Sequence, residues 1–404
     1  MNRENYPAKL VITATLLLVL SFTTYGSGRG LDRYEPGGSD KSAIREAIKS
    51  EVGSEIRDKE IYETSDKSIS EPRGETTEET PLYGNAADET VYEVYKEDIL
   101  YSVKGPDSLY LTRYFYNPKL DNPNITDKKQ PVIMFLFGGN FIEGNRNYKP
   151  YISYFIYYVK KGYQVVTIDY RKGLRKWYSN YIKEVESGKQ PNVKEQEIST
   201  LLMGAVDLAV ADCITATNFI ISKSDKWHTD NDKIILSGSS AGAITALQTE
   251  YYHSNRYFNS DVKVRERLPK NFSYAGIISF AGAVFTQKGE PAFGNNVTPV
   301  LFFHGDADPS VPYNYVNMYK GGIYGSAYLA ENFLDSSHPF SFCKTINADH
   351  GIAFSAMNNM VVIDEFLKDY IIKQKRSYNI REESVKADKP LKKNFTLYEY
   401  LFVN

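Results

Sequence analysis

The segment LSGSSAGAI contains the residues whose types and spacing most clearly suggest chemistry: three serines, Ser237, Ser239 and Ser240. A serine hydroxyl is a weak nucleophile until a neighbouring base activates it. Gly238 and Gly242 flank Ser240 two positions away on each side, which gives the pattern G-x-S-x-G. Neither of the other serines has glycines at both offsets. We therefore take Ser240 as the candidate nucleophile.

The sequence around Ser240 predicts the strand, sharp turn and helix that this pattern requires. Residues 234–238 read as an apolar strand, and a helix pattern leaves from Ser240. The Ser240 hydroxyl would then stand at the carboxyl edge of a sheet. The Ala241 N–H would lie at a helix N-terminus, where negative charge is favoured. The alternative interpretation is a turn that is merely rich in glycine and serine.

A serine nucleophile needs a base, and His350 is the best-placed histidine. It follows directly after a predicted strand at 340–348 and precedes Gly351. In a parallel sheet, reactive groups sit just past the carboxyl ends of the strands. His228 and His338 lie before a strand, and His253 ends a helix. His304 lies next to the carboxylate candidates. We interpret His304 as support for its loop.

The carboxylate that orients the base should come from the segment FFHGDADPSVP, which follows a predicted strand at 298–305. Asp306 and Asp308 both satisfy this position. Pro309 restricts the backbone directly after Asp308 and gives that residue a mild preference. The residues alone leave the choice between the two aspartates open.

Oxyanion donors are predicted from the segment FLFGGNFIEG, which follows the apolar strand 131–137. Gly138 and Gly139 allow the backbone to turn its N–H groups toward a ligand. Together with the Ala241 N–H they would bind a tetrahedral oxyanion. One such donor contributes about 3 kcal/mol of transition-state stabilisation.

Strand patterns alternate with helix patterns through most of the chain, which predicts an α/β fold with a parallel sheet covered on both faces. A hairpin at 91–116 precedes them and adds an antiparallel edge. Cys213 and Cys343 fall on different layers of this arrangement, so we expect no disulfide. The expected strands are 131–137, 163–170, 233–238, 274–282, 298–305 and 340–348, and the expected helices are 151–162, 198–222, 240–252 and 352–372.

Taken together, these motifs resemble the α/β-hydrolase superfamily in its esterase and lipase branch, closest to bacterial carboxylesterases of the feruloyl-esterase-like and hormone-sensitive-lipase-like kind. The resemblance spans roughly residues 90–375. It implies a triad of Ser240, Asp308 and His350, because the family pattern H-G-x-x-D-x-x-V-P places its aspartate on Asp308. It rests on FGGNF at 137–141, DYR at 169–171, GSSAG at 238–242, HGDADPSVP at 304–312 and DHG at 349–351.

The chain departs from the family pattern at the oxyanion loop. The family's H-G-G-G begins with histidine, where this chain has Phe137, and its third glycine is Asn140. Both changes leave the backbone donors in place. The resemblance therefore implies an oxyanion hole formed by the N–H groups of Gly139, Asn140 and Ala241.

The activity that these features predict is a serine carboxylic-ester hydrolase that works through an acyl-enzyme without a cofactor or a metal. Small or aromatic acyl esters, including esters on plant polysaccharides, are the expected substrates, because two polar and aromatic segments, 175–197 and 313–333, are placed to shape the pocket. One alternative is a serine peptidase of the prolyl-oligopeptidase type, weakened because no repeat-built propeller precedes the hydrolase part. A second is a non-catalytic hydrolase-fold binding protein, which would be expected to lack a triad member.

Composition and the terminal segments predict the partners, the location and the domain bounds of the protein. The formal net charge of −2 does not favour a nucleic-acid partner. Residues 1–28 resemble a secretory signal, so we expect a secreted or periplasmic protein with no stable membrane insertion after cleavage. An uncleaved anchor is the alternative. Residues 29–89 form an acidic linker, 90–375 the catalytic domain, and 376–404 a C-terminal extension.

Overall fold

The computed structural model describes residues 32–34, 80–81, 94–116, 129–189, 191–255, 264–386 and 389–402. The expected signal at 1–28 lies outside these residues, as does most of the expected linker. Of the expected linker, the described residues are two short strands, β1 (Asp32–Tyr34) and β2 (Thr80–Pro81).

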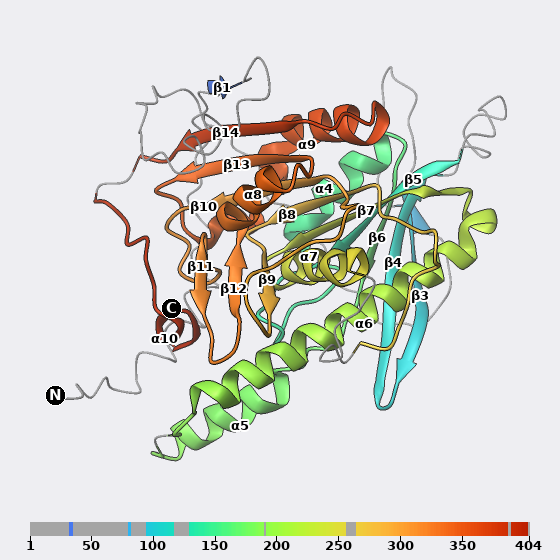
Figure 1. Ribbon diagram of the computed structural model, residues 1–404. Helices are drawn as coiled ribbons and strands as arrows, with labels where there is room; N and C mark the ends of the chain where they lie inside the picture. Colours follow the sequence, from blue (N-terminus) through green and yellow to red (C-terminus); the bar gives the residue numbers. More distant parts are fainter. Residues whose placement is uncertain are drawn as a thin grey trace, which may run out of the picture.

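An 11-stranded sheet forms the centre of the molecule, in the order β1-β14-β13-β10-β8-β7-β5-β6-β4-β3-β2 (Figure 1). Neighbours pair in parallel from β14 to β6, and β4 and β3 continue the sheet in antiparallel. The predicted α/β-hydrolase architecture, a mostly parallel sheet with an antiparallel edge hairpin, is confirmed. The strands are β3 Val94–Lys104, β4 Asp107–Tyr116, β5 Gln130–Leu136, β6 Gln164–Ile168, β7 Thr229–Ser239, β8 Gly276–Phe280, β10 Val300–Gly305, β13 Phe340–Ile346 and β14 Tyr378–Ser384.

Helices cover both faces of this sheet, and two consecutive residues of β5 show how. The Phe135 ring packs 4.6 Å from the Tyr151 ring of α4, between ring centroids. The Met134 sulfur lies 3.9 Å from the Thr217 hydroxyl of α6. Successive strand residues point to opposite faces, so α4 and α6 lie on opposite sides. The helices are α4 Lys149–Lys160, α5 Arg175–Glu186, α6 Glu195–Trp227, α7 Ala241–Ser254, α8 Ser326–Asp335, α9 Met360–Phe366 and α10 Leu397–Phe402.

Helix α6 is the one helix in the described ranges that is long and apolar enough to cross a membrane, yet 72% of its most apolar window is buried inside the fold. Burial of this extent is typical of the core helix of a globular domain. The Tyr252 hydroxyl of α7 donates to Asp207 of α6 over 2.8 Å, which fixes the two helices side by side. Cys213 on α6 and Cys343 on β13 are both buried and free, as the expected layering predicted.

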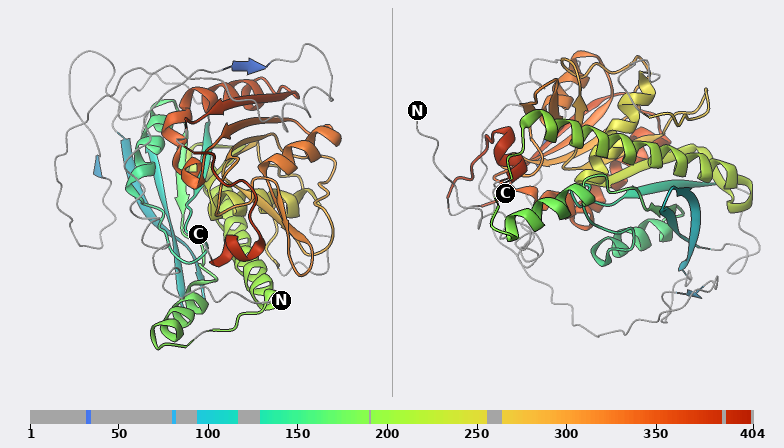
Figure 2. Two further views of the ribbon diagram at one scale, coloured as in Figure 1. Left: turned by 90° about the vertical axis from the view of Figure 1, so that its left-hand side faces the viewer. Right: turned by 90° about the horizontal axis from the view of Figure 1, so that it is seen from below.

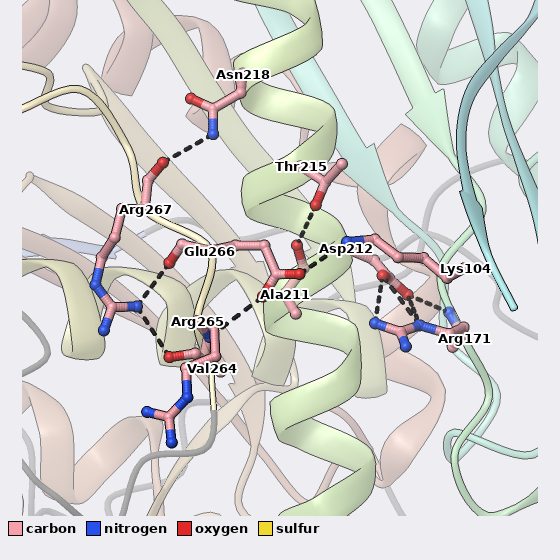
Figure 3. A network of polar contacts seen from close by, with 10 residues as sticks. All are labelled: Lys104, Arg171, Ala211, Asp212, Thr215, Asn218, Val264, Arg265, Glu266 and Arg267. Carbon is pink, nitrogen blue, oxygen red and sulfur yellow. Dashed lines mark hydrogen bonds and ion pairs between the residues drawn. The ribbon is translucent and has the colours of Figure 1, made fainter.

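A polar network joins α6 to the edge hairpin (Figure 3). Arg171, which follows β6, donates to both carboxylate oxygens of Asp212 on α6 at 2.8–3.1 Å. Lys104, at the end of β3, pairs with Glu266 at 2.8 Å. The arginine of the DYR motif therefore ties the end of β6 to α6 and lies in this network.

The segment expected as one closing helix at 352–372 is divided, so that prediction is wrong in detail. Two 3-10 turns, His350–Phe354 and Ala356–Asn359, precede α9, and a π-helical turn, Leu367–Ile372, follows it. The Ser355 hydroxyl donates to the Ile352 carbonyl at 2.8 Å. Side chains that bond the local backbone in this way compete with regular helical bonding.

Beyond residue 375, where we expected the catalytic domain to end, the chain adds β14 to the main sheet. This strand pairs in parallel with β13 along its whole length. Its sequence, YNIREES, has few apolar residues, and only Ile380 and Arg381 are buried. A polar strand at this end of the sheet gives too weak a hydrophobic pattern to be recognised from sequence.

A second, three-stranded sheet in the order β11-β12-β9 lies beside the main one. Strands β9 (Ala283–Thr286), β11 (Tyr315–Asn317) and β12 (Gly322–Gly325) pair in antiparallel. The aromatic segment expected at 313–333 therefore forms a hairpin followed by α8. The polar segment expected at 175–197 contains α5, in which no side chain is buried.

Candidate active site

Ser240 stands in a strained turn between β7 and α7. Its backbone has φ 51° and ψ −121°, a conformation that L-residues rarely adopt. Its N–H donates to the Phe280 carbonyl of β8 at 2.8 Å, and its carbonyl accepts from the Ile244 N–H at 2.9 Å. The turn is therefore fixed on both sides, and the hydroxyl is held at the carboxyl edge of the sheet.

The two glycines that flank Ser240 are required by close packing. A Cβ atom at Gly242 would lie 2.0 Å from the Leu136 carbonyl oxygen of β5. A Cβ atom at Gly238 would lie 2.5 Å from the backbone of Gly242. No side chain fits at either position without moving backbone, which explains the spacing seen in the sequence.

The structure brings Ser240, His350 and Asp308 into one hydrogen-bonded line. His350 Nε2 lies 2.9 Å from the Ser240 hydroxyl, and His350 Nδ1 lies 2.7 Å from Asp308 Oδ2. All three side chains are buried, with residue exposures of 3%, 7% and 1% in the order serine, histidine, aspartate. The imidazole therefore has a hydroxyl at one nitrogen and a carboxylate at the other.

Asp308 accepts hydrogen bonds at both of its oxygens. Oδ1 accepts from the N–H groups of Ser310 and Val311 at 2.8 and 2.9 Å. Oδ2 lies 2.7 Å from His350 Nδ1 and 3.2 Å from Nε2 of His304. His304, which we expected to support this loop, is buried and lies against the carboxylate itself. Both residues belong to the segment HGDADPSVP, but the motif alone did not predict this contact.

The charges of this group are coupled. Burial alone would raise the pKa of Asp308, but the adjacent His350 and the hydrogen bond from His304 outweigh burial and lower it. Burial alone would lower the pKa of His350, but the Asp308 carboxylate outweighs that effect and raises it. Asp308 therefore stays ionised at neutral pH, and the imidazole has an increased affinity for a proton.

The other two serines of the opening segment bond to tyrosines of α4. The Ser237 hydroxyl lies 3.1 Å from the Tyr154 hydroxyl. Ser239 accepts from the Tyr151 hydroxyl at 2.9 Å and donates to the Ala353 carbonyl at 2.6 Å. Because Ala353 belongs to the 3-10 turn that begins at His350, Ser239 ties the nucleophile strand to the histidine turn.

Asp306, the aspartate that the sequence could not separate from Asp308, has a different place. Its Oδ1 accepts from the Asn347 N–H at 2.7 Å, and its Oδ2 pairs with Lys393 at 3.0 Å. Asp306 therefore joins the loop that carries Asp308 to the loop that carries His350.

The predicted oxyanion loop runs beside the nucleophile. A Cβ atom at Gly138 would lie 3.1 Å from Ser240 Cβ. Gly139 has φ 128° and Asn140 has φ 54°, so the backbone turns sharply here. The Ala241 N–H belongs to the first turn of α7, whose N–H groups have no partner within the helix. The oxyanion loop therefore begins beside Ser240 at Gly138; the expected donors Gly139 and Asn140 follow Gly138, and Ala241 follows Ser240.

Phe137, which replaces the family's histidine, has a structural role. It stacks on Tyr170 with ring centroids 4.5 Å apart. The Tyr170 hydroxyl donates to the Phe137 carbonyl at 2.5 Å. The Asn140 side chain is exposed. This departure from the family pattern therefore fills the core beneath the loop and leaves the backbone donors unchanged.

A cavity of about 290 Å³ lies elsewhere, at the amino ends of β13 and β14. It is lined by Ser341, Asn379 and Arg381, among others, and His350 lies past the opposite end of β13. The cavity is therefore separate from the serine site. Among the described residues, no group of three or more histidine, cysteine, aspartate or glutamate side chains is arranged to hold a metal ion.

The fold and the serine–histidine–aspartate line define an α/β-hydrolase domain. Residues 205–290, which include Ser240, match the family BD-FAE. Two solved structures of esterase 2 from Thermogutta terrifontis, one with propionate bound and one phosphorylated by paraoxon, are similar at 19% identity with a TM-score of 0.46. The match covers 68% of this chain and 93% and 94% of theirs. None of the curated proteins compared with the chain matches it.

Proposed function

We propose that the protein is a serine hydrolase of carboxylic esters. The observation that carries this proposal is the line Ser240–His350–Asp308 with hydrogen bonds of 2.9 and 2.7 Å, at a serine held in a strained strand-to-helix turn. This arrangement supplies a nucleophile, a base and an orienting carboxylate in the roles that acyl transfer requires.

In the first half-reaction, His350 Nε2 takes the Ser240 proton as the serine oxygen attacks the ester carbonyl. Asp308 holds Nδ1 protonated and stabilises the imidazolium that forms. The tetrahedral oxyanion accepts from the backbone N–H groups of Gly139, Asn140 and Ala241. His350 then gives its proton to the departing alkoxide, which leaves an acyl-serine.

In the second half-reaction, the same groups work on water. His350 takes a proton from a water molecule, the hydroxide attacks the acyl-serine, and the acid leaves as the proton returns to Ser240. No cofactor or metal takes part in these steps. A protonated imidazole cannot accept the serine proton, so activity depends on the neutral form of His350.

Small or aromatic acyl esters, including esters on plant polysaccharides, are the substrates we propose. Support comes from the segment that follows the Asp308 loop, where tyrosines of the β11–β12 hairpin and α8 pack together. The rings of Tyr315 and Tyr324 stack with centroids 6.1 Å apart, and Tyr328 packs against both. Tyr315 is 52% exposed and presents a face on which a phenolic or sugar ring could stack.

We also propose export to the periplasm or the medium, on the sequence of residues 1–28. Arg3 and Lys9 precede the apolar run 10–22, and Gly26, Ser27 and Gly28 follow it. A run of this length, with small residues behind it, is typical of a cleaved signal. Fractionation of an expressing cell and N-terminal sequencing of the mature chain test this proposal.

The activity is tested with p-nitrophenyl acetate, methyl ferulate and a prolyl-peptide substrate, each with and without a fluorophosphonate that labels active serines. The expected result is ester hydrolysis and labelling at Ser240, both lost in Ser240→Ala. Cleavage of the peptide in preference to the esters would favour a prolyl-oligopeptidase-type peptidase. A folded wild-type chain that neither turns over any substrate nor labels would indicate a binding protein.

A further inference from the structure

The end of the chain lies in front of the carboxyl edge of the sheet. Figure 1 shows β10 and β13 ending on the side where α10 sits, and the left view of Figure 2 shows α10 in front of that edge. We infer that residues 389–402 cap the esterase site and that Tyr400 limits the size of the ester group it accepts. This inference deepens the proposed function and rests on it.

An ion pair anchors this segment to the catalytic loops. Lys393 pairs with Asp306 at 3.0 Å, and Asp306 accepts from the Asn347 N–H at 2.7 Å. Asp306 lies two residues before Asp308, and Asn347 lies three residues before His350. Asp306 is buried and the Lys393 side chain is 29% exposed, so this ion pair is partly shielded from solvent. The anchor therefore joins the cap to both loops that hold the triad.

The segment also has a defined local structure. The Thr396 N–H donates to Glu399 Oε2 at 2.9 Å, and the Glu399 N–H donates to the Thr396 hydroxyl at 3.3 Å. This reciprocal pair is a capping box, which fixes where a helix begins. Lys392 adds an ion pair to Glu399 at 2.5 Å. Helix α10 thus begins at a set position relative to the anchor at Lys393.

Tyr400 is a partly buried tyrosine of α10, the helix that follows the anchor at Lys393. Its ring packs against Phe395 with centroids 5.4 Å apart. Burial and the nearby Asp308 carboxylate raise the pKa of Tyr400. The phenol is therefore neutral and partly buried, on a segment that Lys393 anchors to the loop of Asp308. Tyr398, on the same helix, is 58% exposed and serves as a matched comparison.

This placement has a consequence for selectivity. With the cap in place, Ser240 is only 3% exposed. A tyrosine ring at the mouth of such a site occupies volume that a long acyl or alcohol chain would need. Removing the ring opens that volume, whereas removing Tyr398 does not. The ratio of activity on long to short esters should therefore depend on residue 400 and not on residue 398.

The experiment measures kcat/KM for p-nitrophenyl acetate, butyrate and octanoate with the full-length chain, Tyr400→Ala, Tyr398→Ala and Lys393→Ala. We expect Tyr400→Ala to raise the octanoate-to-acetate ratio by about tenfold or more, the scale on which pocket size discriminates between chain lengths. Lys393→Ala should raise the ratio in the same direction, because the anchor is lost. Tyr398→Ala should leave the ratio within about twofold.

Fluorophosphonate labelling and a thermal melt of each variant separate the possible failures. An unchanged ratio in a folded Tyr400→Ala chain that still labels at Ser240 would overturn the cap and leave the esterase proposal standing. An equal change in Tyr398→Ala would also overturn it, because the effect would not be specific to Tyr400. Absence of turnover and labelling in the wild-type chain would remove the proposed function itself.

Discussion

The two loops that carry Asp308 and His350 differ from the segments that surround them. In the loops, Asp306, Asp308 and His350 are buried and make hydrogen bonds of 2.7–2.9 Å or an ion pair. In the surrounding segments, α5 has no buried side chain, and Tyr315, like Tyr398 of α10, is more than half exposed.

This difference indicates that the two loops carry out the reaction and that the surrounding segments select the substrate. A triad contributes most when its groups are held in place before the substrate arrives. A surrounding surface of exposed side chains is easier to change without loss of the fold, and such segments are where binding specificity usually lies. Substitutions in the loops should therefore lower kcat, whereas substitutions in the surrounding segments should change the preference among esters.

The largest effect is expected at Asp308. Asp308→Asn leaves the imidazole without its orienting carboxylate and in the wrong tautomer, which costs about 10⁴ in kcat in the well-studied serine proteases. We expect a loss of that order with little change in KM. Steady-state kinetics on p-nitrophenyl acetate measures both quantities.

Asp306→Asn is the matched control for this prediction. An asparagine oxygen can still accept from the Asn347 N–H, so the two loops stay joined and kcat should fall by less than about tenfold. Equal losses in the two variants would show that the whole loop, and not the Asp308 carboxylate, sets the rate.

A smaller effect is expected at Ser239, because it bonds to the histidine turn without touching substrate. Ser239→Ala leaves the buried Tyr151 hydroxyl and the Ala353 carbonyl without this partner, which costs about 1–3 kcal/mol of unfolding free energy. Because that turn carries His350, we also expect kcat to fall. Chemical unfolding and steady-state kinetics test the two effects.

Ser237→Ala supplies the comparison for Ser239. It removes a bond to Tyr154 from the same strand face, whereas the hydrogen bond to Ala353 of the histidine turn comes from Ser239. Stability should fall by about 1 kcal/mol, with kcat nearly unchanged. A loss of kcat as large as that of Ser239→Ala would contradict the link through Ala353.

The order of motifs made the sheet and the approximate site predictable from sequence. Apolar runs such as 131–137 and 298–305 fall on central strands because a strand buried on both faces must be apolar throughout. The pattern around Ser240 reflects close packing, since neither Gly238 nor Gly242 has room for a side chain. Such constraints on residue size leave a clear mark in a sequence.

The parts that were not predicted depend on contacts between distant, ordinary residues. Lys393 pairs with Asp306, although the two residues lie far apart in the sequence and share no motif. His304 and Asp308 do share a motif, but the motif alone does not show that the imidazole lies against the carboxylate. Strand β14 has few apolar residues, and helix α10 is only six residues long, so the periodic pattern of each is weak. Only the folded chain brings these residues together.

The pH dependence of the reaction tests the electrostatic part of the comparison. The pKa of His350 is raised above its ordinary value of 6.5, and the imidazole must be neutral to accept the serine proton. Activity should therefore be low in acid and rise with pH through that raised pKa. In Asp308→Asn the carboxylate no longer favours the charged imidazole, so the apparent pKa should move down. A pH profile of kcat/KM for both enzymes measures the shift, and an unchanged midpoint would contradict it.

The smallest effect on kcat is expected at Glu250, on the helix that begins beside Ser240 but away from the reacting groups. Its side chain is buried, Oε1 accepts from the Thr298 N–H at 3.0 Å, and Oε2 is without a hydrogen-bond partner among the described residues. Burial raises the pKa of this carboxyl to about 7, even though the Thr298 bond acts in the other direction. The folded chain therefore binds this proton more tightly than the unfolded chain, whose carboxyl has the ordinary pKa of 4.5.

The linkage gives the sign of the effect. The tighter proton binding of Glu250 stabilises the folded chain by about 3 kcal/mol at most. This contribution to the free energy of unfolding is complete below about pH 4.5 and is lost as the pH rises through about 7. Glu250→Gln keeps the oxygen that faces Thr298 and removes the charge. Its melting temperature should match that of the wild type near pH 4.5 and exceed it above pH 8, with kcat unchanged. A difference in melting temperature that does not vary with pH would show that the carboxyl is not titrating, and a changed kcat would show that the scaffold behind Ser240 is coupled to the reaction.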